Sequence, residues 1–180
     1  MKRAVLASLF GALIAACVPC MAQAPAEMPK PGPEHQRLGY FVGKWRGEGE
    51  MKPGPFGPGG KFTEAEDVEW MPGGFFLLIH SDEKGPMGNG KTLMILGYDS
   101  EKKAYTFNAF DSMGQHESAT GKVEGDTWTW VSDSKIAGRQ VKSRFTMKQV
   151  SPTSYTTKFE MQPEGGSWNT IMEGKSTKIK

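Results

Sequence analysis

The sequence predicts an all-β fold: a single antiparallel up-and-down β-barrel of about ten strands with a short N-terminal helix. Three observations support this. Beyond residue 43, apolar and polar side chains alternate in short segments, as they do in half-buried strands. Turn-forming residues such as Pro72-Gly73-Gly74 and Glu164-Gly165-Gly166 separate these segments. The intervals leave no room for crossover helices, which favours a closed meander over a sandwich.

The first 24 residues have the features of a signal peptide. A basic start precedes the apolar run 4–16, which is too short to span a bilayer, and Ala22-Gln23-Ala24 has the form of a signal-peptidase site. Cleavage there predicts a periplasmic or secreted protein. Alternatively, Ile14-Ala15-Ala16-Cys17 is a lipoprotein box, and Cys17 carries a lipid that anchors the protein to a membrane. The intact mass of the exported protein distinguishes the two processing routes.

Composition argues against several classes of function. Both cysteines, Cys17 and Cys20, lie in the leader, so cleavage after Ala24 leaves no disulfide, no thiolate zinc site and no cysteine nucleophile. The whole chain has 22 basic and 20 acidic residues, and the leader holds two of the basic ones and none of the acidic ones. The mature part therefore has no net charge, and nucleic acid is not expected as a partner.

A proline-rich spacer at residues 25–33 is expected to precede the barrel domain, residues 34–180. The domain should open with a short helix that ends near Gly43. Trp45 then begins the first strand, where Gly47 and Gly49 leave little side chain beside it. Glycine within a strand marks a bend or a close approach of another group. Trp45 is therefore expected to plug the narrow end of the barrel.

The remaining strands are predicted from the same alternation. The ten segments are residues 44–51, 61–71, 74–83, 91–98, 103–111, 114–122, 126–134, 138–149, 153–162 and 166–179.

Two of these strands are apolar on both faces, around residues 75–79 and 93–96. An apolar outer face has to be covered. The two candidates for the cover are the helix near Tyr40 and Phe41, folded back over the strands, and a second copy of the chain in a homodimer.

The segment from Gly85 to Thr92 fits the phosphate-loop pattern G-x-x-x-x-G-K-[ST]. That motif holds phosphates only where the loop opens a helix. Here the residues after Lys91 read as a strand, so a glycine-rich hairpin is predicted in place of a nucleotide site.

Three histidines are present. His35 lies near the spacer and is expected to be exposed. His80 shares a face with Phe76 and Leu78, and a polar group on a lumen face would need a partner. His116 follows a turn and is expected at the barrel mouth. No histidine spacing typical of a metal site occurs, and no metal is predicted.

Acidic residues cluster on the second predicted strand. Glu64 and Glu66 share a face with the apolar residues Phe62 and Val68. Carboxylates on such a face can have raised pKa values and act as an acid or a base. More often such a row marks a wet barrel interior or a solvated edge.

The segment from Gly43 to Gly49, GKWRGEG, resembles the G-x-W opening of the calycin superfamily and is similar to the G-x-W-x-G-x-G start of nitrobindins, ten-stranded barrels that bind haem. The mature chain also resembles a bacterial family of exported domains of unknown function, of the DUF 1579 type. The matching segments are Pro72 to Phe75, Leu96 to Asp99, Phe110-Asp111-Ser112 and Gly121 to Asp126.

These resemblances imply a lipocalin-like barrel and no established activity. Nitrobindins ligate haem through a histidine late in the chain, and no histidine follows His116 here. The resemblance therefore does not extend to haem, and no cofactor is expected.

The expected function is non-catalytic binding of a small, largely apolar ligand in the lumen. The expected binding residues are Trp45, Phe76, Leu78, His80, Met94, Asp111, His116, Trp128, Trp130, Phe145, Phe159 and Met172. One alternative is a dimerising or protein-interaction barrel with a filled core, which would use the apolar strands near Leu77 and Leu93. The other is an enzyme at the barrel mouth that uses His116 and Asp111.

Overall fold

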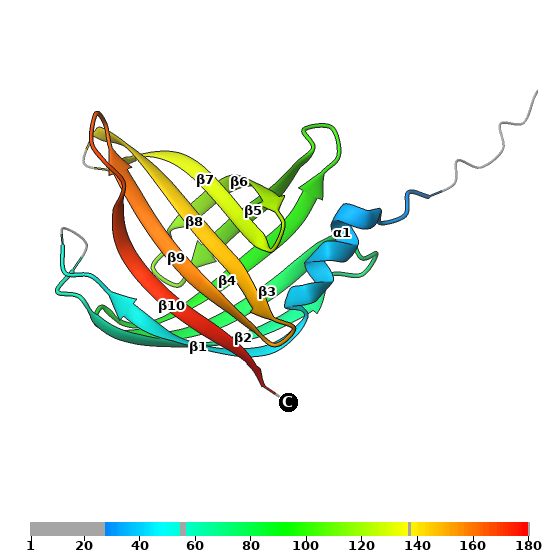
Figure 1. Cartoon of the computed structure of the whole chain (residues 1–180), viewed down its shortest axis with the longest axis horizontal. Coiled ribbons are helices and arrows are strands. Elements are labelled where there is room, and N and C mark those ends of the chain that lie inside the picture. Colours follow the sequence, from blue (N-terminus) through cyan, green and yellow to red (C-terminus); the bar gives the residue numbers. More distant parts are fainter. Residues whose placement is uncertain (1–27, 55–56, 137, 180) are drawn as a thin grey trace, which may run out of the picture.

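The computed structural model describes residues 28–54, 57–136 and 138–179. In this part the chain forms a closed barrel of ten antiparallel strands with a short helical segment at one end (Figure 1). The predicted fold class is confirmed. The signal peptide predicted at residues 1–24 lies outside the described residues and stays a prediction.

All ten predicted strands are present, with ends that differ from the predicted ones by a few residues. A helix α1, Pro33–Leu38, continues into the 3-10 turn η1, Gly39–Phe41. The strands are β1 Gly43–Met51, β2 Gly60–Trp70, β3 Phe76–Gly85, β4 Gly88–Asp99, β5 Ala104–Asp111, β6 His116–Glu124, β7 Thr127–Ile136, β8 Arg139–Ser151, β9 Ser154–Pro163 and β10 Asn169–Ile179.

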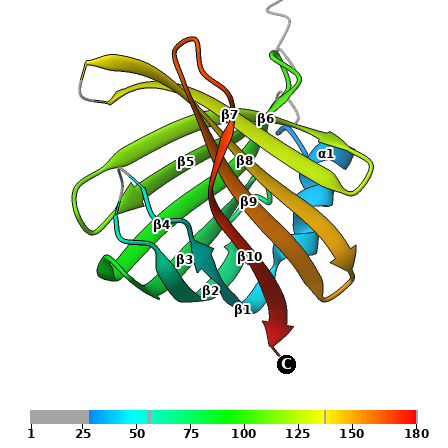
Figure 2. The ribbon, with the colours of Figure 1, turned by 60° about the vertical axis from the view of Figure 1, so that its left-hand side comes forward.

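The barrel closes where the first strand pairs with the last. Figure 2 shows β1 beside β10, and their register runs from Lys44 opposite Ile179 to Met51 opposite Met172. Every other strand pairs with its neighbours in sequence. No described strand is therefore left with an unpaired edge, which removes the usual route to sheet aggregation.

The segment that resembles a phosphate loop is a hairpin, as predicted. β3 ends at Gly85 and β4 begins at Gly88, and these two residues face each other in the register. Because the chain continues as a strand, no helix begins at this loop to supply amide groups for a phosphate.

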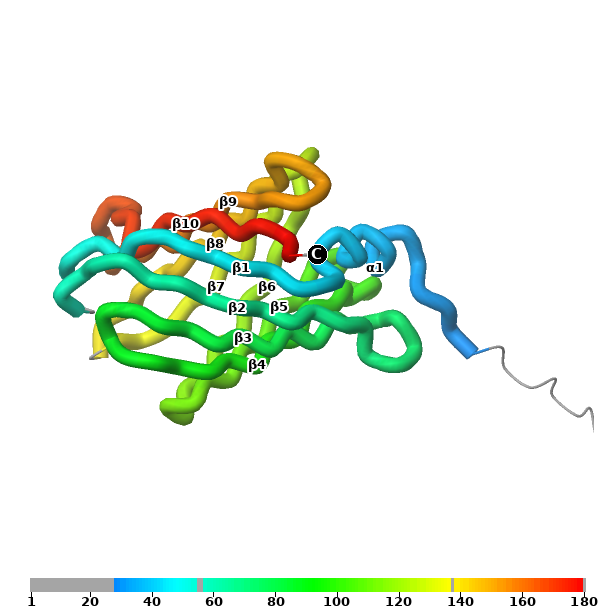
Figure 3. The backbone as a smooth tube through the Cα atoms, turned by 90° about the horizontal axis from the view of Figure 1, so that it is seen from below, coloured from blue at the N-terminus to red at the C-terminus, as the bar shows by residue number. Residues whose placement is uncertain are grey.

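The helical segment closes one end of the barrel, where the turns β2–β3, β4–β5, β6–β7 and β8–β9 also lie (Figure 3). The Tyr40 hydroxyl donates to the carbonyl oxygens of Ser151 and Ser154, each at 2.8 Å. The Arg37 guanidinium donates to the carbonyl oxygen of Gly125 at 2.9 Å. These bonds tie the helical segment to two of the turns. No described helix is long and apolar enough to cross a membrane.

His35 belongs to this closed end and is not exposed as predicted. Its ring packs edge-on against Phe75 at 5.1 Å and Tyr98 at 5.7 Å, and 8% of the residue is exposed. Its Nδ1 atom accepts a hydrogen bond from the Gly32 backbone at 3.2 Å. The reason is the position of α1, which turns His35 toward the barrel.

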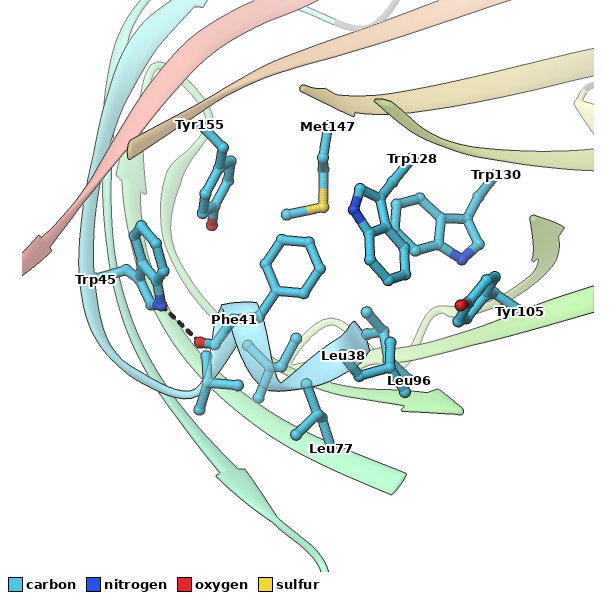
Figure 4. Close-up of a cluster of buried hydrophobic side chains, with 12 residues drawn as sticks. Leu38, Phe41, Trp45, Leu77, Leu96, Tyr105, Trp128, Trp130, Met147 and Tyr155 are labelled. Atoms are coloured by element: carbon cyan, nitrogen blue, oxygen red, sulfur yellow. Dashed lines mark hydrogen bonds between the residues drawn. The ribbon is translucent and has the colours of Figure 1, made fainter. Parts of the chain in front are cut away.

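An aromatic cluster fills the barrel above the helix (Figure 4). The Phe41 ring lies between Trp128 at 5.1 Å and Tyr155 at 5.7 Å. Trp45 is fully buried beside Tyr155, and its indole Nε1 donates to the Phe41 carbonyl oxygen at 2.6 Å. Trp45 and the helical segment therefore fill the closed end of the barrel together.

The apolar outer face of β3 and β4 is not covered by the helix. Leu38 and Phe41 point into the core, so the helical segment seals the end of the barrel and leaves its outside free. Phe76 on β3 stays 41% exposed and Phe110 on β5 stays 44% exposed. Of the two candidate covers, the helix is therefore wrong, and a second copy of the chain stays a prediction.

Candidate functional site

The barrel encloses a cavity of about 400 Å³ above the aromatic cluster. Its walls are mostly apolar. They include Val68, Ile79, Met94, Phe107, Phe145, Met147 and Met172. Its outer rim is formed by Met51, Met113 and the β3–β4 hairpin, residues 84–90. A side recess of about 90 Å³ shares Met94, Phe107 and Phe145 with it.

Six of the predicted binding residues line these spaces. Trp45, Met94, Phe145 and Met172 line the main cavity, while Trp130 and Phe159 line the recess. Trp128 does not line either space, but it is buried in the adjacent cluster, where it stacks on Trp130 at 5.8 Å. Whether these residues contact a ligand stays a prediction.

The prediction that Phe76, Leu78 and His80 face the lumen is wrong. Strand β3 presents Leu77, Ile79 and Ser81 to the interior and puts the other set outside, where His80 is exposed. Both sets are rich in apolar residues, so alternation alone did not identify the inner face. The pairing with β2 identifies the inner face of β3. Val68 on β2 faces inward and lies directly opposite Ile79, so Ile79 also faces inward.

The predicted pair of His116 and Asp111 is not assembled into a site. The Asp111 Oδ1 atom accepts backbone hydrogen bonds from Met113 at 2.9 Å and Gln115 at 2.8 Å, which fix the β5–β6 turn. The exposed His116 ring stacks on Phe110 at 4.7 Å on the outer face. Neither residue lines the cavity. His116 lies beside the β5–β6 turn at the rim, but the prediction that it points to the mouth is wrong, because its strand position turns the ring outward.

Four carboxyl groups stand out among the polar groups that line the lumen. Glu64, Glu66 and Glu83 come from adjacent strands, and Glu64 lies directly opposite Glu83 in the register. Each accepts one side-chain hydrogen bond: Glu64 from Ser176 at 3.1 Å, Glu66 from Tyr155 at 2.8 Å and Glu83 from Thr92 at 2.8 Å. A fourth carboxylate, Glu117, accepts from Ser132 at 2.9 Å.

The glycines of β1 provide space for two of the inner side chains. A Cβ atom at Gly47 would overlap the Glu64 carboxylate, and one at Gly49 would overlap the Phe62 ring. The pattern Trp45-Arg46-Gly47-Glu48-Gly49 thus places the indole at the closed end and makes room for Glu64 and Phe62 in the lumen.

Sequence comparison identifies the family. The chain matches the family described as protein of unknown function (DUF1579) over residues 30–178. It belongs to this family. No curated protein matches the sequence of this DUF1579 chain.

Two solved structures are similar to the DUF1579 barrel. Rv2717c from M. tuberculosis is 12% identical, with a TM-score of 0.56, over 83% of this chain and 99% of that one. The S-type phycobiliprotein lyase CPES from Guillardia theta is 11% identical, with a TM-score of 0.47, over 82% of this chain and 93% of that one. The first likeness shows a shared barrel fold. The resemblance to nitrobindins stays a prediction.

Burial and mutual repulsion shift the pKa values of the lumen groups in the DUF1579 barrel. Removal from bulk water, with the nearby Glu64 charge, raises the pKa of Glu66 to about 8. Burial also raises the pKa of Glu64, although its bond from Ser176 opposes the shift. Burial and the Glu66 charge raise the pKa of Tyr155 well above its ordinary value. Near neutral pH, Glu66 therefore holds a proton unless a cation lies beside it.

Sequence reasoning did not identify Glu83, Thr92 and Glu117 as lumen residues, nor Ser176 as the hydrogen-bond partner of Glu64. It did place Glu64 and Glu66 on a face with Phe62, and the structure puts that face inside. Pairing β2 with β3 in the correct register would have added Glu83, which is two residues beyond Ser81 on the same face. Ser176 and Thr92 are small polar residues whose strands gave no distinct signal.

The described residues contain no group of three or more His, Cys, Asp or Glu side chains that could hold a metal ion. No histidine lines the cavity. The lumen as described therefore offers binding by apolar contact and by hydrogen bonds to carboxyl groups.

Proposed function

We propose that this DUF1579 barrel binds a small, largely apolar molecule in its lumen without transforming it. The observation behind the proposal is the cavity of about 400 Å³, whose apolar walls are reached from the rim around the β3–β4 hairpin. Small-molecule sites in proteins have volumes of about 300 to 1,000 Å³ and mainly apolar linings. The apolar body of a ligand would be removed from water there, and each buried methylene group contributes about 0.8 kcal/mol.

A cavity-filling substitution tests the proposal. Ala109 lines the lumen on β5, and Ala109→Trp would occupy much of the space that a ligand needs. We expect this variant to weaken binding of 1-decanol at least about tenfold, which corresponds to about 1.4 kcal/mol. Isothermal titration calorimetry measures the affinity directly.

The matched control is Ala65→Trp, the same substitution at an exposed outward position of β2. It should leave 1-decanol binding unchanged. The proposal fails if the unmodified barrel does not bind 1-decanol, or if the two variants bind it equally well.

The uncovered outer face favours a second candidate function, association with another copy of the chain. Phe110 is exposed there directly opposite the partly buried Leu93 on β4, and Phe76 is exposed further along the same face, opposite Gly97. We expect a homodimer, and Leu93→Lys should convert it into a monomer because it puts a charge into the apolar face. Light scattering measures the mass, and a monomeric unmodified protein would contradict the dimer.

The proposed place of action is the periplasm or the cell exterior. This rests on the signal-peptide pattern of residues 1–24, with the lipoprotein at Cys17 as the alternative.

A further inference from the structure

The lumen is unbalanced in charge. Four carboxyl groups, Glu64, Glu66, Glu83 and Glu117, line the cavity, and Lys84 at the rim is the single basic residue among the described residues of its lining. Glu64 and Glu66 lie on β2, and Glu83 lies on the neighbouring strand β3, directly opposite Glu64. Like charges directly opposite each other destabilise a sheet. A folded barrel keeps such a cluster at a cost that a ligand of opposite charge would remove.

The carboxyl groups also have unused bonding capacity. Tyr155 bonds only the Oε2 atom of Glu66, Ser176 only the Oε1 atom of Glu64, and Thr92 only the Oε1 atom of Glu83. Within the described chain, the second oxygen of each accepts no hydrogen bond. A carboxylate has about four acceptor sites, so each of these groups has room for further donors.

A separate observation marks the same part of the wall. The hydroxyl of Ser81 is buried, with 4% of the residue exposed, and it has no hydrogen-bond partner among the described residues. Ser81 lies on the inner face of β3, directly opposite Glu66 on one side and Thr92 on the other. Buried hydroxyl groups normally have a partner, and this unpaired one lies on the inner face of β3 between Glu66 and Thr92, which both line the cavity.

The geometry points to a ligand with a protonated amine at one end of an apolar body, the amine seated among Glu64, Glu66 and Glu83. This inference rests on the proposed carrier function and adds the chemistry of the ligand. An ammonium group has three donors and no acceptor, which suits three carboxyls with free oxygens. The apolar body would lie along Met94, Phe145 and Met172 in the rest of the cavity. The rings of Phe62 and Tyr155, which also line it, would favour a cation nearby.

The test compares three probes that share a ten-carbon chain: decylamine, 1-decanol and decanoic acid, titrated calorimetrically at neutral pH. We expect decylamine to bind at least about tenfold more tightly than 1-decanol, and decanoic acid to bind more weakly than both. If decanoic acid binds as tightly as decylamine or more tightly, the inference is overturned and the carrier function stands. Binding of none of the three would overturn both.

Variants locate the amine. Glu64→Gln and Glu66→Gln each keep the shape of the side chain and remove the carboxyl group that could pair with an ammonium group. Each variant should bring its decylamine affinity to within about threefold of its own 1-decanol affinity, with both probes titrated against the same variant. Glu69→Gln makes the same change on the exposed face of the same strand and should leave the affinities for decylamine and 1-decanol as they are in the unmodified protein. Decylamine preference that persists in both lumen variants would overturn the assigned site.

Discussion

Trp45→Ala is expected to lower the free energy of unfolding by about 3 to 5 kcal/mol, the usual cost of removing a large aromatic side chain from a core. The indole is fully buried, lies 4.8 Å from the Tyr155 ring and donates to the Phe41 carbonyl oxygen at 2.6 Å. Its loss would leave a cavity at the closed end and an unpaired carbonyl oxygen on the helical segment. Urea denaturation, followed by the fluorescence of the remaining tryptophans, measures the change.

Trp168→Ala is the matched control. Trp168 is partly exposed and stacks against the Arg144 guanidinium at 4.2 Å, so its loss should cost about 1 kcal/mol. Trp45→Phe should fall between the two variants because it keeps part of the packing and removes the hydrogen bond. Equal losses for Trp45→Ala and Trp168→Ala would show that Trp45 does not hold the closed end together.

Glu66→Gln is expected to remove most of the pH dependence of stability between about pH 5 and pH 8. The folded-state pKa of Glu66 is raised from 4.5 to about 8 by burial and by the nearby Glu64 charge. Between these values the folded chain holds a proton that the unfolded chain has released. The stability that this proton contributes is fully present below about pH 4.5 and is lost as the pH rises through 8.

The slope of that loss is at most about 1.4 kcal/mol per pH unit for one group. Glu64, Glu83 and Tyr155 face Glu66: the charges of Glu64 and Glu83 help to raise its pKa, and the hydrogen bond from Tyr155 opposes the rise. Urea titrations of both proteins at pH 5, 6.5 and 8 give the two slopes. The outward Glu69→Gln variant should keep the slope of the unmodified protein, and an equally flat profile in that unmodified protein would contradict the raised pKa of Glu66.

The fold was largely predictable because most strands have a distinct alternation and turn-forming residues separate them. β8 shows this well: Ser143, Phe145 and Met147 point inward, and Lys142, Arg144 and Lys148 alternate with them. The Gly85 to Thr92 hairpin was predictable for the same reason, since a strand pattern follows Lys91. When the strands pair in sequence order, β1 and β10 are left as the two edges of the sheet. Pairing them closes the barrel and removes both unpaired edges.

The site was less predictable because it depends on which face of each strand turns inward. In β3 both faces are apolar, and a change of one residue in the β2–β3 turn would exchange the sets Phe76, Leu78, His80 and Leu77, Ile79, Ser81. His116 was expected to point to the mouth because it follows a turn, but its position on β6 turns the ring outward. Glu83 lies beside Glu64 because of the register between β2 and β3, and no pattern within either strand predicts that register.

A crystal structure of the protein grown with 1-bromodecane tests the central claim most directly, since the anomalous signal of bromine locates the probe. The account predicts a bromine peak inside the barrel, in the cavity walled by Met94, Phe145 and Met172. A lumen filled by its own side chains, or a peak found only on the outer face beside Phe76 and Phe110, would contradict it.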